Sequence, residues 1–456
     1  MAFYISDILK TSEVNIMQVK VGCAENIIEV PLFAELGGYC PFLGRRNRGV
    51  RDPLYARVLT VNDGTNRNIV VVTDTISSSD LECRKLRVEL ATEFALDPES
   101  IMFIATHTHS AACIASCDVG YGEPSTEFCA NWRSTIRKSL KEALANEEPV
   151  KAIAGKAPIR KPISSRRTTA EDKHVDPEIR WIKMVRADGS VKVLIHNYAM
   201  HGVVFGPQPL VSADWMGDAN RKIKERKLAE IGFFMYGTAG DVNVIWTHKT
   251  PERDKNLEWI SESYVNDLEA DLDNGEEIRL APVKSSLKAV EFPTEKVDPA
   301  EYREIAEKII SKVPDRYARP SNQEEKLLFF THDRLLEMAI LAERGKEFRV
   351  VKDLQALRMG DLAIYAVPGE PFLAVGEDLR ARSPFKFPIA VSVANGDAGY
   401  FPTPEMFAQY PSIFSSDDFG AFGFYEVWFG QGMHRPKFKP NIIEHILSNL
   451  LKLNVN

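Results

Sequence analysis

Short β-branched and apolar runs, each ended by a tight turn, constrain the fold of this chain more than any other feature. Residues 56–61 (ARVLTV) and 68–73 (NIVVVT) flank the turn Asn62-Asp63-Gly64, a pattern typical of a β-hairpin. A second pair of runs, 179–186 and 190–196, flanks Asp188-Gly189. Single runs of the same kind follow at Ile101–Ala105, 233–236, 362–367 and 388–394. The pattern predicts mixed sheets with both hairpin and crossover connections.

Segments with helical spacing of apolar residues alternate with these runs. Ser77-Ser78-Ser79-Asp80 offers N-caps for an amphipathic stretch that runs to about Phe94. Further helices are predicted at about 125–146 and 215–229, and a charged helical insertion at about 299–347. We find no repeat and no linker long enough to separate domains, so we predict a single domain over residues 1–456. Strands alternating with helices predict an α/β fold (mixed α+β).

Composition and charge exclude several classes of protein. The net charge is −7 and no basic stripe is present, so we do not expect binding to nucleic acid. No apolar run approaches the roughly 20 residues of a membrane-spanning helix. The N-terminus lacks the apolar core of a signal peptide, so we expect a cytoplasmic protein with reduced cysteines. The sequence leaves a homo-oligomer open.

Histidines follow two of the predicted strands. His107 and His109 come directly after the run Ile101–Ala105, and His201 follows the run that ends near residue 196. Because residues i and i+2 of a strand point to the same face, His107 and His109 can address one site. The alternative is a pair of hydrogen-bonded structural histidines, and an HxH pattern alone does not separate the two.

Carboxylates and a tyrosine lie in glycine-rich turns after other strands. Asp241 follows Gly240, where it can support a metal ligand or cap a helix. Glu370 is fixed between Gly369 and Pro371, and Tyr400 follows Gly399. If these strand ends converge, they bring together two histidines and a glutamate with room for water, the ligand chemistry of a catalytic zinc site.

The motifs around these residues resemble the N-terminal catalytic domain of the neutral (alkaline, non-lysosomal) ceramidase family. The matching stretches run in the family's order: Gly49–Leu59, Ala105–Ser110, Val175–Lys183, Asn197–Gly202, Ser212–Gly217, Gly237–Val242, Pro368–Phe372 and Gly399–Glu405. The resemblance implies the catalytic domain alone, without the immunoglobulin-like C-terminal domain of full ceramidases. For the fold, we expect two mixed β-sheets covered by helices in a layered α/β/β/α arrangement.

Carried over motif by motif, the resemblance implies one zinc ion (Zn²⁺) per chain and a set of residues around it. The implied ligands are His107, His201, Glu370 and Tyr400. His109 would line the site and hydrogen-bond the substrate or the transition state, and Asp241 is a candidate to move protons. We take Arg166, in Ser165-Arg166-Arg167, as the counterpart of a family arginine, and Tyr425 as that of a later tyrosine.

Asn243 departs from the family, since ceramidases have a serine with a catalytic role at this position. An amide cannot replace a nucleophilic hydroxyl, but it can donate a hydrogen bond to an oxyanion. The sequence therefore favours attack by zinc-activated water on the C–N (amide) bond of a small-molecule substrate. We find no exposed apolar helix suited to extracting a lipid, so ceramide itself is not the expected substrate. An ester, a lactone, a sugar-derived substrate or an inactive metal-binding homologue remain as alternatives.

Overall fold

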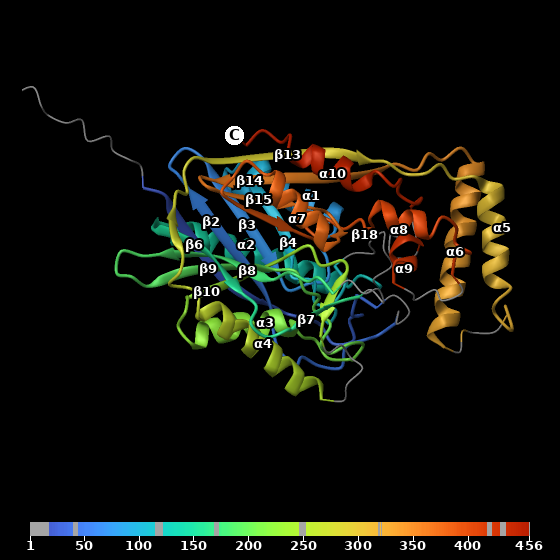
Figure 1. Ribbon diagram of the computed structural model, residues 1–456, viewed down its shortest axis with the longest axis horizontal. Coiled ribbons are helices and arrows are strands. Elements are labelled where there is room, and N and C mark those ends of the chain that lie inside the picture. Colours follow the sequence, from blue (N-terminus) through green and yellow to red (C-terminus); the bar gives the residue numbers. More distant parts are fainter. Residues whose placement is uncertain are drawn as a thin grey trace, which may run out of the picture.

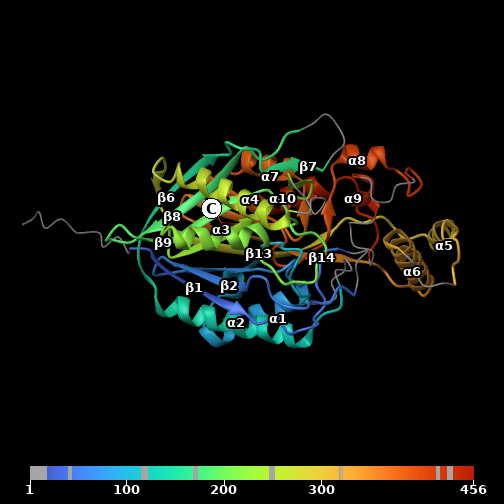
Figure 2. The ribbon, with the colours of Figure 1, turned by 90° about the horizontal axis from the view of Figure 1, so that it is seen from below.

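The first sheet is built around the predicted hairpin. In the computed structural model, which describes residues 18–39, 44–114, 122–167, 173–245, 252–317, 320, 322–416, 422–428 and 435–455, its strands lie in the order β4-β3-β2-β1-β5. They span Ile101–Ala105, Arg67–Thr73, Leu54–Asn62, Lys20–Ile28 and Glu148–Pro149. β2 pairs antiparallel with β1 and β3, while β3 and β4 are parallel, so the sheet is mixed. Helices α1 (Asp80–Phe94) and α2 (Thr126–Ala145) cover its outer face (Figure 2).

The second sheet is also mixed and has the strand order β10-β9-β8-β6-β12. These strands span Ile231–Tyr236, Val191–Tyr198, Glu178–Val185, Lys151–Pro158 and Glu276–Ile278. Helices α3 (Asp214–Glu225) and α4 (Arg253–Glu269) pack on its outer side (Figure 1). The two sheets face each other across one apolar core, and their central strands are buried on both faces.

A third sheet completes the core in the order β13-β14-β15-β17. Its strands span Val283–Phe292, Val350–Met359, Leu362–Ala366 and Phe387–Val391. Helices α7 (Leu373–Arg382) and α10 (Ile442–Leu450) pack against it with α8 (Pro404–Gln409) and α9 (Phe424–Trp428). Two short pairs supply the site: β7 (Ser164–Arg166) with β11 (Val242–Val244), and β16 (Glu370–Pro371) with β18 (Tyr400–Phe401).

The expected mixed α/β class and its layers of helices over sheets are confirmed. The expectation of two mixed sheets misses the third sheet: the predicted runs at 362–367 and 388–394 are its strands β15 and β17, but β13 exposes many of its side chains and lacks a clear apolar run.

The charged segment forms two long helices, α5 (Pro299–Ile310) and α6 (Gln323–Glu343), which stand beside the body next to α8 and α9 (Figure 1). Their shared apolar face packs on Ile413 and Phe424. No helix in the described part of the chain has the length and apolar character needed to cross a membrane. Four cysteines are buried free thiols (Cys23, Cys83, Cys113 and Cys129), and Cys40 and Cys117 lie outside the described residues.

Candidate metal and catalytic site

His107 reaches the site through a left-handed turn. Strand β4 ends at Ala105, and His107, two residues later, has a φ of 65°. Strand alternation, the basis of our prediction for His107 and His109, is therefore not what brings the two rings together. They meet edge to face with centroids 4.8 Å apart because the backbone turns between them. A positive φ costs a residue other than glycine roughly 1–2 kcal/mol, and such strain is often found at functional sites.

Backbone carbonyls orient the rings of both predicted histidine ligands. His107 Nδ1 lies 2.6 Å from the carbonyl oxygen of Ile76, and His201 Nδ1 lies 3.0 Å from that of Val242. A carbonyl oxygen only accepts hydrogen bonds, so each Nδ1 carries a hydrogen and Nε2 is the nitrogen left to bind a metal ion. Histidines that bind metal ions are held in this way in many proteins.

Glu370 lies close to both Nε2 atoms. Its Oε2 lies 3.2 Å from His107 Nε2 and 3.1 Å from His201 Nε2, and all three side chains are buried. Burial alone would raise the pKa of Glu370, but the two histidines outweigh it and hold that pKa well below its usual range. Gly369 makes the position possible, since a Cβ there would lie 2.6 Å from the carbonyl oxygen of Gly399.

His109 belongs to the same cluster but is held differently. Its Nε2 lies 3.3 Å from His107 Nε2, and the metal-binding atoms of His107, His109 and His201 all lie within 4.8 Å of one another. His109 Nδ1 is buried and makes no hydrogen bond to any described residue. The glycine-containing segment before residue 40 covers the ring, since a Cβ on Gly38 would lie 2.7 Å from it. Burial lowers the pKa of His109, and the neighbouring histidines lower it further.

Tyr400 lies beside Glu370, its partner in the parallel pair β16–β18. Its hydroxyl oxygen accepts a hydrogen bond of 3.2 Å from Arg167, whose guanidinium also forms a 2.6 Å ion pair with the fully buried Glu426. Burial raises the pKa of Tyr400 well above its usual value, and the charge of Glu370 adds to the effect. The ring of Tyr425 lies edge-on, with its centroid 6.2 Å from that of Tyr400.

Of the two adjacent arginines, Arg167 contacts Tyr400, whereas Arg166 contacts Asp241. The ion pair between Arg166 and Asp241 is 2.8 Å long, and Asp241 Oδ1 also accepts a 2.8 Å hydrogen bond from the backbone of Leu373, the first residue of α7. Asp241 therefore braces the start of that helix and makes no hydrogen bond or ion pair with the three histidines. The sequence prediction named Arg166, whereas Arg167 is the arginine that contacts Tyr400.

Asn243 lies on β11, paired in register with Ser165. It directly follows Val242, whose carbonyl holds His201. Its side chain is partly buried and forms no hydrogen bond with the described residues. Its position in the sequence thus places Asn243 next to the residue that orients His201.

The donor set fits a zinc ion. Two Nε2 atoms that the backbone fixes as lone-pair donors and one carboxylate oxygen meet at one point, and nitrogen and oxygen ligands in this combination are those of catalytic zinc sites. His109 differs from the two predicted ligands because its Nδ1 has no hydrogen-bond partner among the described residues. A histidine that binds a metal ion usually donates a hydrogen bond from its second nitrogen to an acceptor. The geometry thus separates two oriented histidines from a third that lacks this support.

Comparison with solved structures identifies the architecture. A neutral ceramidase from Pseudomonas aeruginosa superposes on this chain with a TM-score of 0.73 at 16% sequence identity, over 96% of this chain and 74% of that one. The chain has the neutral ceramidase fold. A second structure with this fold, a ceramidase complexed with C2, gives a TM-score of 0.71 at 15% identity, over 96% of this chain and 75% of that one.

The sequence itself matches less readily. A scan against models of protein families finds no match, and a search of curated proteins finds none either. The resemblance to the neutral ceramidase fold, stated above on short motifs, is nevertheless confirmed by the structure over nearly the whole chain.

Proposed function

We propose that this protein is a zinc-dependent hydrolase that cleaves an amide C–N bond in a small molecule. The observation that carries the proposal is the meeting of His107 Nε2, His201 Nε2 and Glu370 Oε2 in a buried site, with both imidazoles held in the ligand tautomer by backbone carbonyls. The neutral ceramidase fold supports the choice of an amide, because ceramide is itself an amide.

In this proposal His107, His201, Glu370 and Tyr400 hold one zinc ion per chain. Zinc bound there would polarise the substrate carbonyl and lower the pKa of a water molecule toward about 7. Tyr400 is included as a ligand because it lies beside Glu370 on the adjoining strand.

The remaining residues move protons and orient the substrate. His109 is adjacent to the ligands, and its ring is not fixed in one tautomer by a described acceptor, which suits a group that accepts and returns a proton. Arg167 takes the role that the sequence assigned to Arg166, because Arg167 reaches Tyr400. We assign to Tyr425 and to the amide of Asn243 contacts with the substrate or its carbonyl oxygen, supported by the ring contact of Tyr425 with Tyr400 and by the position of Asn243 next to Val242.

We propose a substrate with an apolar part, although the sequence led us to doubt ceramide. The segment that covers His109 also exposes the side chains of Leu32 and Phe33, which are 63% and 64% exposed. Exposed apolar side chains on this segment favour an amide that carries an apolar chain or ring. The buried free thiols of the described cysteines support a reducing compartment, the cytoplasm.

The test combines metal analysis with a substrate panel. Elemental analysis of the purified protein should find about one zinc per chain. A panel of N-acyl amino alcohols, including a short-chain ceramide, would be assayed beside esters and lactones of matched length. His107→Ala should abolish turnover and zinc binding, and His445→Ala, which alters a histidine on α10, should preserve both. Protein without zinc would overturn the proposal, and turnover confined to esters or lactones would overturn the amide assignment.

A further inference from the structure

A second cavity lies away from the histidine cluster, between the second and third sheets. It has a volume of about 310 Å³ and is lined by residues of β6, β8, the end of α7 and β17. This volume is at the lower end of the range for small-molecule sites. The lining combines aromatic and cationic side chains: Lys156, Arg180, Trp181, Arg380, Phe385, Lys386 and Phe387. None of the described residues that line the cavity is acidic.

Three of the four cations are already paired. Lys156 contacts Glu178 at 2.8 Å, Arg180 makes a two-pronged contact with Asp176, and Lys386 pairs with Glu276. Each of these acidic partners approaches from outside the lining of the cavity.

Arg380 is different from the other three. It is partly buried, and its guanidinium makes no ion pair and no hydrogen bond with any described residue. Burial lowers the pKa of Arg380 to about 10, and repulsion from Arg180 contributes. The C-terminus of α7 offsets part of this charge through its partial negative charge, but a helix end is a weak substitute for a carboxylate. A guanidinium with free donors at a cavity wall is suited to a two-pronged contact with a carboxylate or phosphate.

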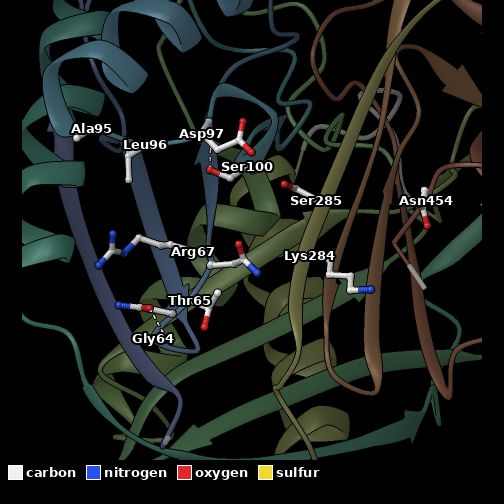
Figure 3. Close-up of a pocket in the computed structure, with 12 residues that line it drawn as sticks. Gly64, Thr65, Arg67, Ala95, Leu96, Asp97, Ser100, Lys284, Ser285 and Asn454 are labelled. Carbon is white, nitrogen blue, oxygen red and sulfur yellow. Dashed lines mark hydrogen bonds between the residues drawn. The ribbon is translucent and has the colours of Figure 1, made fainter.

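Another cavity in the described part shows the contrast. It has a volume of about 500 Å³ and lies at the turn between β2 and β3, against β13 (Figure 3). Its arginine, Arg67, is already bound to Glu147 through contacts of 2.7 and 3.1 Å, and its lining includes the carboxylate of Asp97. That cavity offers no unpaired guanidinium and little apolar surface.

We propose that the cavity between β6, β8, α7 and β17 binds a compact organic anion, with a carboxylate or phosphate group on Arg380 and an aromatic or apolar body against Phe385 and Phe387. The flat rings supply contact for the body of the ligand, and Arg380 supplies the charge. This site is independent of the proposed hydrolase chemistry.

The test is a calorimetric titration with three probes. Indole-3-acetate and phenyl phosphate represent the two anionic groups, and indole-3-acetamide has nearly the shape of the first without its charge. Each would be titrated into the full-length wild type, Arg380→Gln and Arg382→Gln. Arg382 is the matched control because it lies two residues further along the same helix and pairs with Glu444 outside the cavity.

We expect at least one anion to bind the wild type and Arg382→Gln alike, with a dissociation constant of roughly 1 mM or below. The neutral amide should bind at least tenfold more weakly, and Arg380→Gln should lose at least tenfold in affinity for the anion. If Arg380→Gln does not fold, Arg380→Lys keeps the charge without the planar fork and should still weaken binding. The proposal is overturned if neither anion binds, if the amide binds equally well, or if the variants of Arg380 bind like the wild type.

Discussion

Replacing Gly38 by alanine tests the role of His109 without touching any of the proposed zinc ligands. The added Cβ would lie 2.7 Å from Cγ and from Nδ1 of His109, whereas ordinary contact begins at 3.4 Å. The ring must therefore move by about 0.7 Å, since packed interiors leave little other room. A misplacement of about 1 Å can cost a catalyst roughly 100-fold in rate, so we expect kcat to fall between about 10- and 100-fold.

The backbone adds a second, separate effect. Gly38 has a φ of 101°, which an alanine adopts only at a cost of roughly 1–2 kcal/mol, so the free energy of unfolding should fall by about that amount. Gly44→Ala is the control because Gly44 has a φ of 86° but nothing lies within 4 Å of an added Cβ. Both variants should lose similar stability, and only Gly38→Ala should lose rate.

Three measurements test these two effects: kinetics on the best substrate of the panel, urea unfolding and zinc analysis. Gly38→Ala should keep its zinc, because we assign His109 to proton transfer and not to metal binding. Loss of zinc in this variant would show that His109 is a ligand. Equal rates in Gly38→Ala, Gly44→Ala and the wild type would refute the claim that the covering segment positions the ring.

Three further predictions concern the ligand set and its surroundings. Glu370→Gln should weaken zinc binding by at least roughly 100-fold in a competition titration, since it removes the charged oxygen between the two histidines; an unchanged affinity would remove Glu370 from the ligands. Arg167→Met leaves the buried Glu426 without its cation and should lower the free energy of unfolding by about 3–5 kcal/mol, with recovery in the double variant with Glu426→Gln; a loss below about 1 kcal/mol would contradict the ion pair. Burial lowers the pKa of His196 to about 4 from an ordinary value of 6.5, so the unfolded chain binds the proton first as the pH falls. Stability should therefore be full above pH 6.5 and drop by about 3 kcal/mol on the way to pH 4, and this drop should be missing in His196→Gln.

The sequence predicted the site best where strands deliver residues directly. The apolar run Ile101–Ala105 is a strand with those bounds, and His107 follows it as expected. His107 and His109 are neighbours as expected, but a left-handed residue and not strand alternation brings the two rings together. A periodic sequence pattern cannot predict a single positive φ at a histidine.

The prediction of Glu370 and Tyr400 as ligands depended on the family resemblance, because a contact between two distant turns joins them. They pair in a two-residue strand contact between segments 30 positions apart, which leaves no local pattern to detect. Arg167 was missed for a related reason. The register of β7 on β11 decides which of two adjacent arginines faces Tyr400, and three-residue strands are too short for periodicity to fix a register.

The carbonyls of Ile76 and Val242 have a consequence for how such a protein can evolve. When side chains hold a metal ligand, each of them is a position that mutation can damage, and a change there must be compensated elsewhere. A main-chain oxygen is present whichever residue occupies the position, so substitutions at 76 and 242 leave the acceptor in place as long as the backbone keeps its path. Selection then acts on the course of the backbone at these two positions and not on the identity of the supporting residues. This separation lets many residues around the site change while the imidazoles of His107 and His201 keep their orientation.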